Sequence, residues 1–265
     1  MVKRKKEVLR GIFIFLFFVT VGIFLSSTAY TADDGKNLYE GRCVLCHGPL
    51  GDGKGLVQVL PRFYKFGKVW TTKPRDFTKL PRDFTTAVYK YRTTPSGCLP
   101  TDNDLAKTIE NGIPRAYMPS NGDLSPSEIS KIIEYIKTFS KVWTENANDA
   151  SCAPITINKP DYLGSAESIS KGEQIWVKMK CADCHGAEGK GDGPKALDII
   201  DDWGNPILPF DFTSCTAKAT FKPESGYRSF STGLSGSGMP SYSDSLNEEE
   251  RWNLVSYTLK LMGKI

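Results

Sequence analysis

Cys43-Val-Leu-Cys-His47-Gly48 is the stretch that decides the organisation of the chain, and it returns later as Cys181-Ala-Asp-Cys-His185-Gly186. A short helical pattern that ends in an aromatic residue precedes each copy. A glycine-rich loop, an Asp-Phe-Thr element, a Met-Pro-Ser element and an amphipathic segment follow each copy in the same order. The 265-residue chain is therefore an internal duplication, and its length suits two domains of ordinary size.

The recurring features give the duplication its landmarks. The helical patterns end at Tyr39 and Trp176, the glycine-rich loops span 51–55 and 189–193, the Asp-Phe-Thr elements begin at Asp83 and Asp211, and the Met-Pro-Ser elements begin at Met118 and Met239. A second Asp-Phe-Thr begins at Asp76 in the first copy only. Neither loop has the residue order of a phosphate-binding P-loop, so we interpret both loops as tight turns.

An amphipathic helix is predicted at the end of each copy. In the first copy, Ser125 suits an N-cap, Pro126 suits the first helical position, and Glu128 completes a capping box ahead of regularly spaced isoleucines. In the second copy, Asn247 precedes three glutamates, and negative charge is favourable in the first turn of a helix. Both helices should therefore begin at these polar residues.

A C-x-x-C pair followed directly by histidine is typical of covalent haem attachment, because two cysteines at this spacing can bond the two vinyl groups of one haem. The following histidine then faces the iron. Structural zinc and a dithiol redox site are the alternatives for a C-x-x-C pair, and the distance between the copies and their parallel surroundings disfavour zinc. We expect two haem c groups, held by Cys43, Cys46, Cys181 and Cys184 and ligated by His47 and His185.

The composition limits the candidates for the sixth iron ligand, because the chain contains only two histidines and five methionines. Met1 is the initiator, Met179 lies two residues before a haem-binding cysteine, and Met262 falls in the last turn of a predicted helix. Met118 and Met239 remain, each in a proline-flanked loop before the final helix. We predict that both ligate iron; packing in the core is the alternative role for these side chains.

The N-terminus has the layout of a secretory signal: basic residues, the apolar run 11–25 and then small residues up to Ala29. We expect residues 1–29 to be cleaved, and the alternative is an uncleaved anchor that associates with the membrane through residues 11–30. Either outcome places the protein in the periplasm or on the outer face of the cytoplasmic membrane. The leader's net charge of +4 equals that of the whole chain, so the mature protein is formally neutral and nucleic-acid binding is not expected.

Three cysteines lie outside the haem motifs: Cys98, Cys152 and Cys215. In an exported protein one disulfide can form among them, and three pairings can be written. The alternative to a disulfide is that Cys98 or Cys215 ligates an iron as a thiolate.

Charge is shared unequally between the copies. The segment 54–92 has ten basic and two acidic residues, a net charge of +8, whereas the equivalent segment 190–228 has a net charge of −1. The first copy could dock an acidic partner; solvated loops are the alternative explanation. Between the copies the sequence turns polar and loses helical periodicity, so we expect domains at 30–145 and 168–265 with a linker at 146–167.

The haem motifs, the segments Tyr89-Lys-Tyr-Arg-Thr-Thr-Pro-Ser-Gly97 and Leu99-Pro-Thr-Asp-Asn-Asp-Leu105, and the two Met-Pro-Ser elements resemble the class I cytochrome c family. The similarity is to dihaem members found alongside molybdenum enzymes of the dimethyl sulfoxide reductase family. It implies an all-α fold of two tandem class I cytochrome c domains, each a small helical bundle around a covalently bound haem. It also implies that the first and last helices of each domain cross through their aromatic residues.

The function implied is electron transfer rather than enzyme catalysis. Two His/Met-ligated haems would pass single electrons between periplasmic or membrane redox partners, such as a molybdenum enzyme or a terminal oxidase. The alternatives are a dihaem enzyme of the peroxidase or thiosulfate-oxidising type, with an open or thiolate-ligated iron, and a fixed haem subunit of a respiratory complex.

Overall fold

The computed structural model describes residues 32–57, 81–145, 150–214 and 221–265. The expected leader, the membrane-associating stretch 11–30, the second Asp-Phe-Thr at Asp76 and Cys215 lie outside the described residues. Regular structure in the described ranges is helical, with two isolated β-bridges and no strand. The predicted all-α fold is confirmed.

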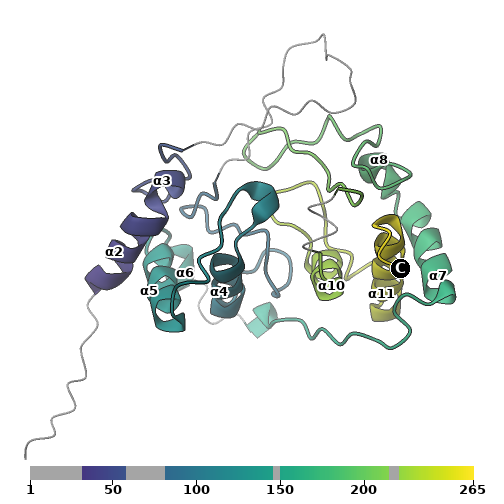
Figure 1. The fold of residues 1–265 in the computed structure, drawn as a ribbon, viewed down its shortest axis with the longest axis horizontal. Helices are drawn as coiled ribbons and strands as arrows, with labels where there is room; N and C mark the ends of the chain where they lie inside the picture. Colours follow the sequence, from purple (N-terminus) through teal and green to yellow (C-terminus); the bar gives the residue numbers. More distant parts are fainter. Residues whose placement is uncertain (1–31, 58–80, 146–149, 215–220) are drawn as a thin grey trace, which may run out of the picture. The chain divides into compact units, whose positions relative to one another are not determined.

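The first half contains helices on both sides of its haem motif (Figure 1). They are α2 (Ala32–Arg42), α3 (Val44–His47), α4 (Asp102–Asn111), the 3₁₀ turn η1 (Pro114–Ala116), α5 (Pro126–Lys137) and α6 (Val142–Glu145). The second half repeats this arrangement after the 3₁₀ turn η2 (Ala150–Cys152). Its helices are α7 (Ala166–Lys178), α8 (Ala182–His185), α10 (Pro223–Thr232) and α11 (Glu248–Leu261).

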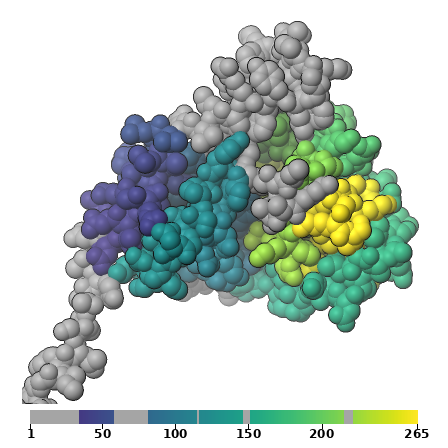
Figure 2. Space-filling model, viewed as in Figure 1, coloured from purple at the N-terminus to yellow at the C-terminus, as the bar shows by residue number. Residues whose placement is uncertain are grey.

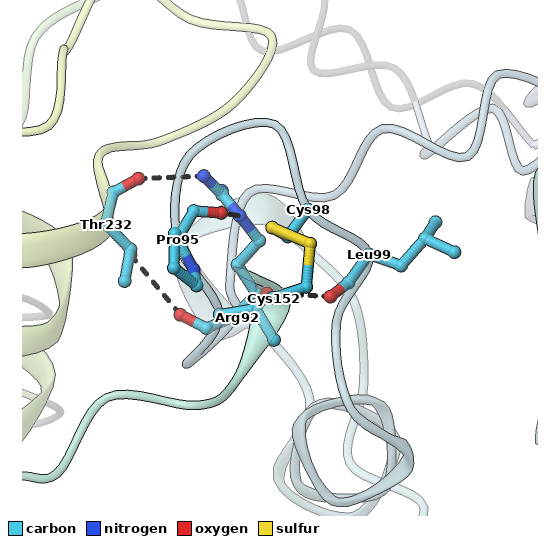
Figure 3. Close-up of a disulfide and its surroundings, with 7 residues drawn as sticks. Arg92, Pro95, Cys98, Leu99, Cys152 and Thr232 are labelled. Atoms are coloured by element: carbon cyan, nitrogen blue, oxygen red, sulfur yellow. Dashed lines mark hydrogen bonds between the residues drawn. A yellow bond between two sulfur atoms is a disulfide. The ribbon is translucent and has the colours of Figure 1, made fainter. Parts of the chain in front are cut away.

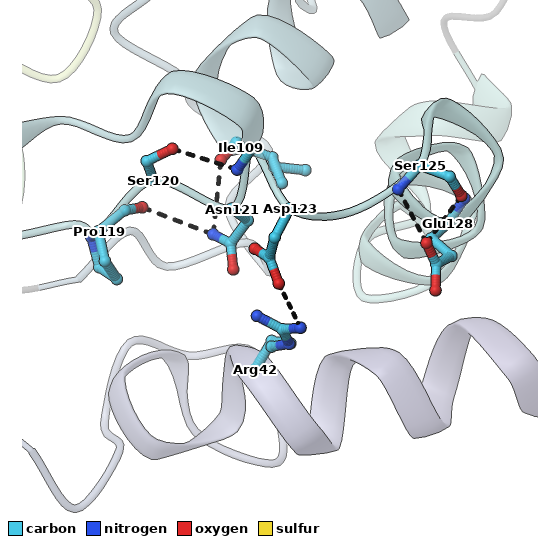
Figure 4. A network of polar contacts seen from close by, with 9 residues as sticks. Arg42, Ile109, Pro119, Ser120, Asn121, Asp123, Ser125 and Glu128 are labelled. Carbon is cyan, nitrogen blue, oxygen red and sulfur yellow. Dashed lines mark hydrogen bonds and ion pairs between the residues drawn. The ribbon is translucent and has the colours of Figure 1, made fainter.

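The two predicted helix starts are confirmed. The Ser125 hydroxyl accepts a hydrogen bond from the backbone N–H of Glu128, and the Glu128 carboxylate accepts one from the Ser125 N–H (Figure 4). Asn247 and Glu250 form the same reciprocal pair at the start of α11. Each pair satisfies backbone donors that the first turn of a helix otherwise leaves free.

In each half the first helix packs against the last, α2 against α5 and α7 against α11. The fully buried ring of Tyr39 lies 5.3 Å from that of Tyr135, and the ring of Trp176 lies 5.6 Å from that of Tyr257. The aromatic crossing expected from the family resemblance is therefore present in both halves.

A glycine allows the close approach of the helices at each crossing. A side-chain carbon at Gly172 would meet the backbone carbonyl of Asn253 on α11 and lie 2.8 Å from Cβ of Tyr257. One at Gly35 on α2 would meet the carbonyl of Lys131 on α5. The two crossings are built on the same steric requirement.

Each half buries its own hydrophobic core. One cluster of buried residues runs from Tyr39 to Ile136, and a separate one runs from Ile175 to Met262. In the space-filling view the purple-to-teal residues of the first half and the green-to-yellow residues of the second gather separately (Figure 2). Each half therefore has a hydrophobic core of its own.

The helices α4 and α10 were not predicted from the pattern, and they correspond to each other in both length and position. Each has ten residues and ends at a glycine with positive φ, Gly112 at 65° and Gly233 at 66°. Thr101 caps α4 through a capping box with Asp104, whereas α10 begins with Pro223 at its first position. These two helices carry the Met-Pro-Ser loops at their C-terminal ends.

A disulfide joins Cys98 to Cys152, so the structure selects one of the three pairings that the sequence left open (Figure 3). The N–H of Ile155 donates to the carbonyl of Thr93 nearby. Ile157 and Leu163 on the same connecting segment pack against the second core. The connection between the halves is thus attached to both of them.

The Gly172→Ala variant should lower the free energy of unfolding by about 1–3 kcal/mol, the usual cost of inserting a methyl group into a packed contact. The matched control is Gly41→Ala, also in a first helix, where an added carbon meets nothing within 4 Å. That change should raise stability by up to about 1 kcal/mol, because alanine is the better helix former. Thermal unfolding of the haem-loaded protein measures both; equal effects would contradict the crossing described here.

Reduction of the disulfide should lower stability by about 4 kcal/mol, the chain-entropy value for a loop closed by residues 54 apart. The measurement is guanidinium unfolding with and without a phosphine reductant, in a Cys215→Ser background that prevents thiol exchange. The double variant Cys98→Ala, Cys152→Ala should match the reduced protein. An unchanged unfolding midpoint would mean that the bridge adds nothing to stability.

Candidate haem sites

The two haem motifs have the same backbone geometry. In each, the histidine N–H donates to the carbonyl of the first cysteine at 2.9 Å, which forms one helical turn, α3 or α8. Residues four apart in a helical turn lie on one face. The first cysteine and the histidine of each motif, Cys43 with His47 and Cys181 with His185, therefore share a face.

The glycine-rich loops fold back over the motif helices, as predicted for tight turns. Gly53 N–H donates to the His47 carbonyl at 3.0 Å, and Gly191 N–H donates to the His185 carbonyl at 2.7 Å. Two residues later, Gly55 and Gly193 donate to the carbonyls of the second cysteines, each at 3.1 Å. A side-chain carbon at Gly55 would meet the carbonyls of Leu45 and Cys46, and one at Gly193 would meet the carbonyls of Ala182 and Asp183, so only glycine fits.

The Asp-Phe-Thr elements dock on these loops. Phe84 N–H donates to the Gly51 carbonyl at 2.7 Å, and Phe212 N–H donates to the Gly189 carbonyl at 2.8 Å. Each aspartate accepts hydrogen bonds from the N–H and hydroxyl of the threonine two residues later. This closed turn fixes the position of the residue that precedes the aspartate.

The preceding residue orients the histidine. Nδ1 of His47 lies 3.0 Å from the Arg82 carbonyl, and Nδ1 of His185 lies 3.0 Å from the Phe210 carbonyl. Since a carbonyl only accepts, Nδ1 carries the proton and the lone pair lies on Nε2, which is the tautomer that can ligate a metal. Burial lowers the pKa of His47, which keeps its imidazole neutral, and the Phe84 ring stacks on it at 4.5 Å.

Burial favours the protonated form of three motif thiols, those of Cys43, Cys181 and Cys184. Burial raises the pKa of Cys43 to about 11 and that of Cys181 to about 12. Burial also raises the pKa of Cys184. A thioether forms when the S–H of a cysteine adds across a haem vinyl group, so these side chains have the chemistry that covalent attachment needs.

The Met-Pro-Ser loops correspond residue by residue. Ile113 N–H donates to the Met118 carbonyl at 2.9 Å, and Leu234 N–H donates to the Met239 carbonyl at 3.1 Å. Next in sequence, the hydroxyls of Ser120 and Ser241 donate to the last turns of α4 and α10 at 2.5 and 2.6 Å. Both methionines are half-buried, Met118 against the first core and Met239 against the second.

Further contacts hold the first Met-Pro-Ser loop. The Asn121 amide donates to the carbonyl of Ile109 at 3.4 Å, and Arg42 at the end of α2 pairs with Asp123 at 2.7 Å (Figure 4). The Arg42 guanidinium lowers the pKa of the Asp123 carboxyl. Because this ion pair is exposed, its role is to position the loop beside the haem motif rather than to add stability.

The residues present fit haem c. Each half offers two thiols, one imidazole that is protonated at Nδ1 and one half-buried thioether, which is the donor set of a covalently bound His/Met haem. In the second half the buried indole N–H groups of Trp176 and Trp252 have no acceptor among the described residues, and Trp176 lies 5.8 Å from His185. Buried donors of this kind suit the carboxylates that a haem carries.

The fold and the donor set together define a helical haem protein of the c type. Comparisons with known proteins agree. The family model for cytochrome c matches residues 169–261, and the model for cytochrome c oxidase, cbb3-type, subunit III matches residues 31–136. No curated protein matches the chain.

Among solved structures, one similar chain comes from the Kuenenia stuttgartiensis reducing HAO-like protein complex Kustc0457/Kustc0458. It is 35% identical, with a TM-score of 0.74, and the match covers 86% of this chain and 96% of that chain. The chain belongs to the cytochrome c family, with two cytochrome c domains in tandem. Covalently bound haem c and haem-based electron transfer follow from this membership.

Two observations hold for the described ranges only. In the described ranges, no helix is long and apolar enough to cross a membrane. Over the same residues, no three His, Cys, Asp or Glu side chains gather as a metal-binding group.

The sequence pattern missed how the histidines are oriented. It identified both Asp-Phe-Thr elements as landmarks but not that Arg82 and Phe210, directly before them, accept the imidazole hydrogen bonds. The repetition of Asp-Phe-Thr after both haem motifs could have indicated this role. An element that recurs outside the helices together with the histidine is a candidate for contact with that histidine.

Proposed function

We propose that this protein carries two haem c groups and transfers single electrons between redox partners, without substrate chemistry of its own. Cys43, Cys46 and His47 hold the first haem, and Cys181, Cys184 and His185 hold the second, with Met118 and Met239 as the sixth ligands. The observation that supports this most directly is the residue-by-residue correspondence of the two Met-Pro-Ser loops. A methionine that only filled space would not need a loop that is held by the same hydrogen bonds in both halves.

His/Met ligation suits electron transfer because it raises the reduction potential and leaves no open iron position. The enzyme alternative, of the peroxidase or thiosulfate-oxidising type, needs an open iron or a thiolate ligand. Cys98 is bonded to Cys152 and so offers no thiolate, which leaves Cys215 as the cysteine that this alternative would use. The disulfide therefore favours the carrier function.

A fixed haem subunit of a larger complex is the second candidate, and one observation favours it: the similar chain from Kuenenia stuttgartiensis belongs to a protein complex. In both cases we propose export through the leader 1–29 to the periplasm or the outer face of the membrane. The proposed domains are 30–145 and 168–265, joined by a linker at 146–167. A molybdenum enzyme and a terminal oxidase are the candidate partners.

We propose that an acidic redox partner docks on the first half. The side chains of Leu45, Leu50 and Leu56 are 56%, 70% and 91% exposed around the first haem motif. Lys54 in the same segment is largely exposed and pairs with Asp52 at 3.6 Å. The positions equivalent to Leu45 and Leu50 in the second half are Asp183 and Glu188, each paired with a lysine. An apolar patch beside positive charge suits a partner with an acidic rim.

The oxidised protein should show two equivalents of the weak near-infrared band that iron bonded to methionine sulfur produces. Met118→Leu and Met239→Leu should each remove one equivalent, because leucine keeps the volume but has no sulfur. Met179→Leu and Met262→Leu, which alter packing methionines of the second half, are the controls and should keep both equivalents. One equivalent or none in the unaltered protein would make the enzyme alternative the better explanation.

Oxidation of the reduced protein by ferricyanide should slow as ionic strength rises, because counterions screen attraction between the anion and the first half. Oxidation by a cationic cobalt complex should accelerate over the same range. The mature chain has a formal net charge of zero, so its net charge alone predicts no dependence of the rates on salt. Opposite salt dependences with the anionic and the cationic oxidant would therefore indicate positive charge near the site of electron transfer. Salt-independent rates with both oxidants would count against docking by charge.

A further inference from the structure

The loop that carries Met239, residues 233–239, begins at a contact between the two halves. Arg92 of the first half is fully buried, and its guanidinium donates to the carbonyl of Thr232, the last residue of α10, at 2.8 Å (Figure 3). The Thr232 hydroxyl donates back to the Arg92 carbonyl at 3.3 Å. The guanidinium also donates to two carbonyls of the first half, those of Pro95 and Tyr89. The start of the Met239 loop is thus bonded to the first half.

A turn of the second half packs on the same loop. An isolated β-bridge between Ile200 and Pro206 closes this turn, at residues 199–207. The ring of Trp203 in the turn lies against the backbone of Gly236, because a side-chain carbon at Gly236 would come within 2.5 Å of Cη2 of the ring and 2.6 Å of Cζ3. Gly236 also has a positive φ of 75°. A glycine at this position is what allows the tryptophan to cover the loop.

The first half contacts this tryptophan and the loop beneath it. The Arg82 guanidinium lies over the Trp203 ring, 4.8 Å from its centroid. Burial lowers the pKa of Arg82 because its charge loses water, and Asp201 on the turn is within electrostatic range. Cγ1 of Val88 lies 3.5 Å from the place that a side-chain carbon at Gly236 would take. Tryptophan is the aromatic residue that attracts a cation most strongly, and the attraction grows where water is excluded.

Arg82 is also the residue that orients the histidine of the first haem motif. Its backbone carbonyl lies 3.0 Å from Nδ1 of His47, while its side chain reaches Trp203. From Trp203 the contacts continue to Gly236, which lies three residues before Met239. A continuous series of contacts therefore connects the histidine of the first motif with the methionine loop of the second half.

The equivalent positions carry different residues in the other direction. Phe210 takes the place of Arg82 before the second Asp-Phe-Thr element, and its ring packs on two phenylalanines of its own half at 4.8 and 6.3 Å. Arg115 takes the place of Gly236, three residues before Met118. The hydrogen bonds and the ion pair described above for the first Met-Pro-Ser loop all lie within the first half. The first loop is held by its own half, whereas the second is held by both.

We propose that Arg82 and Trp203 are positioning residues through which the first half keeps Met239 on the iron of the second haem. This inference rests on the proposed His/Met ligation of both haems. Methionine ligation raises the reduction potential, so a loosened loop would lower the potential of the second haem and open its iron to other ligands. Contact with the first half therefore keeps the second haem in the form that suits electron transfer.

The test is displacement of Met239 from ferric iron by added imidazole, in the full-length, haem-loaded protein. A Met118→Leu background removes the near-infrared band of the first haem, so that the remaining band reports Met239. In this background Arg82→Gln should lower the imidazole concentration that removes half of the band by about tenfold, as expected for the loss of one cation–π contact shielded from water. The variant keeps the backbone carbonyl that orients His47. Arg82→Lys should restore most of the resistance to imidazole, because the charge returns.

A second variant tests whether the arginine acts through the ring. Trp203→Ala should lower the imidazole concentration at least as much as Arg82→Gln, since the contact with Gly236 is lost too. The double variant should match Trp203→Ala, because the arginine then has no ring to act on. A double variant that is clearly more sensitive than Trp203→Ala would overturn the proposal.

Lys137→Gln is the matched control. Lys137 also lies over a tryptophan ring, that of Trp143 at 5.2 Å, but both residues belong to the first half. Its removal should leave the imidazole concentration unchanged. Haem content and thermal unfolding are recorded on the same samples. Absence of the band from the Met118→Leu protein itself would contradict the proposed ligation, whereas a band that is present and equally resistant in Arg82→Gln would contradict this inference alone.

Discussion

The hydrogen bond between the haem-motif histidine and a backbone carbonyl is the contact on which the rest of each half depends. It fixes the tautomer of His47 and His185, so that the electron pair lies on Nε2, the atom proposed to ligate the iron. The acceptor carbonyl sits directly before an Asp-Phe-Thr turn, that turn docks on a glycine-rich loop, and the loop is hydrogen-bonded to the motif helix. This series of hydrogen bonds begins and ends at the haem motif of the same half. Its parts depend on one another, which explains why the motif, the glycine-rich loop and the Asp-Phe-Thr turn occur together in both halves.

Local chemistry explains which parts of the fold could be predicted from the sequence. The starts of α5 and α11 are signalled by capping residues next to regularly spaced apolar residues, and the aromatic crossings repeat at matching positions. The helix α4 was not predicted although Thr101 and Asp104 form a capping box, because only two apolar residues, Leu105 and Ile109, mark its buried face. The Cys98–Cys152 pairing could not be predicted, since it depends on how the connection between the halves folds back on the first half.

The two halves keep the same backbone but have diverged on the surface and at their mutual contact. Leu45 and Leu50 surround the first motif where acidic residues with lysine partners surround the second. At the contact, Arg92 of the first half and Thr232 of the second exchange hydrogen bonds in both directions. These differences lie where each half meets something other than its own core.

Buried polar groups show that the cofactor is part of the folded structure rather than an addition to it. Trp176 and Trp252 bury indole N–H groups without acceptors, and Arg92 buries a charge without a counter-ion. Such groups destabilise a chain that lacks partners for them. The free energy of folding of the haem-loaded protein then includes contacts that the polypeptide alone does not make. The chain without haem should therefore be markedly less stable than the haem-loaded protein, because its glycine-lined loops and buried donors are arranged around the cofactor.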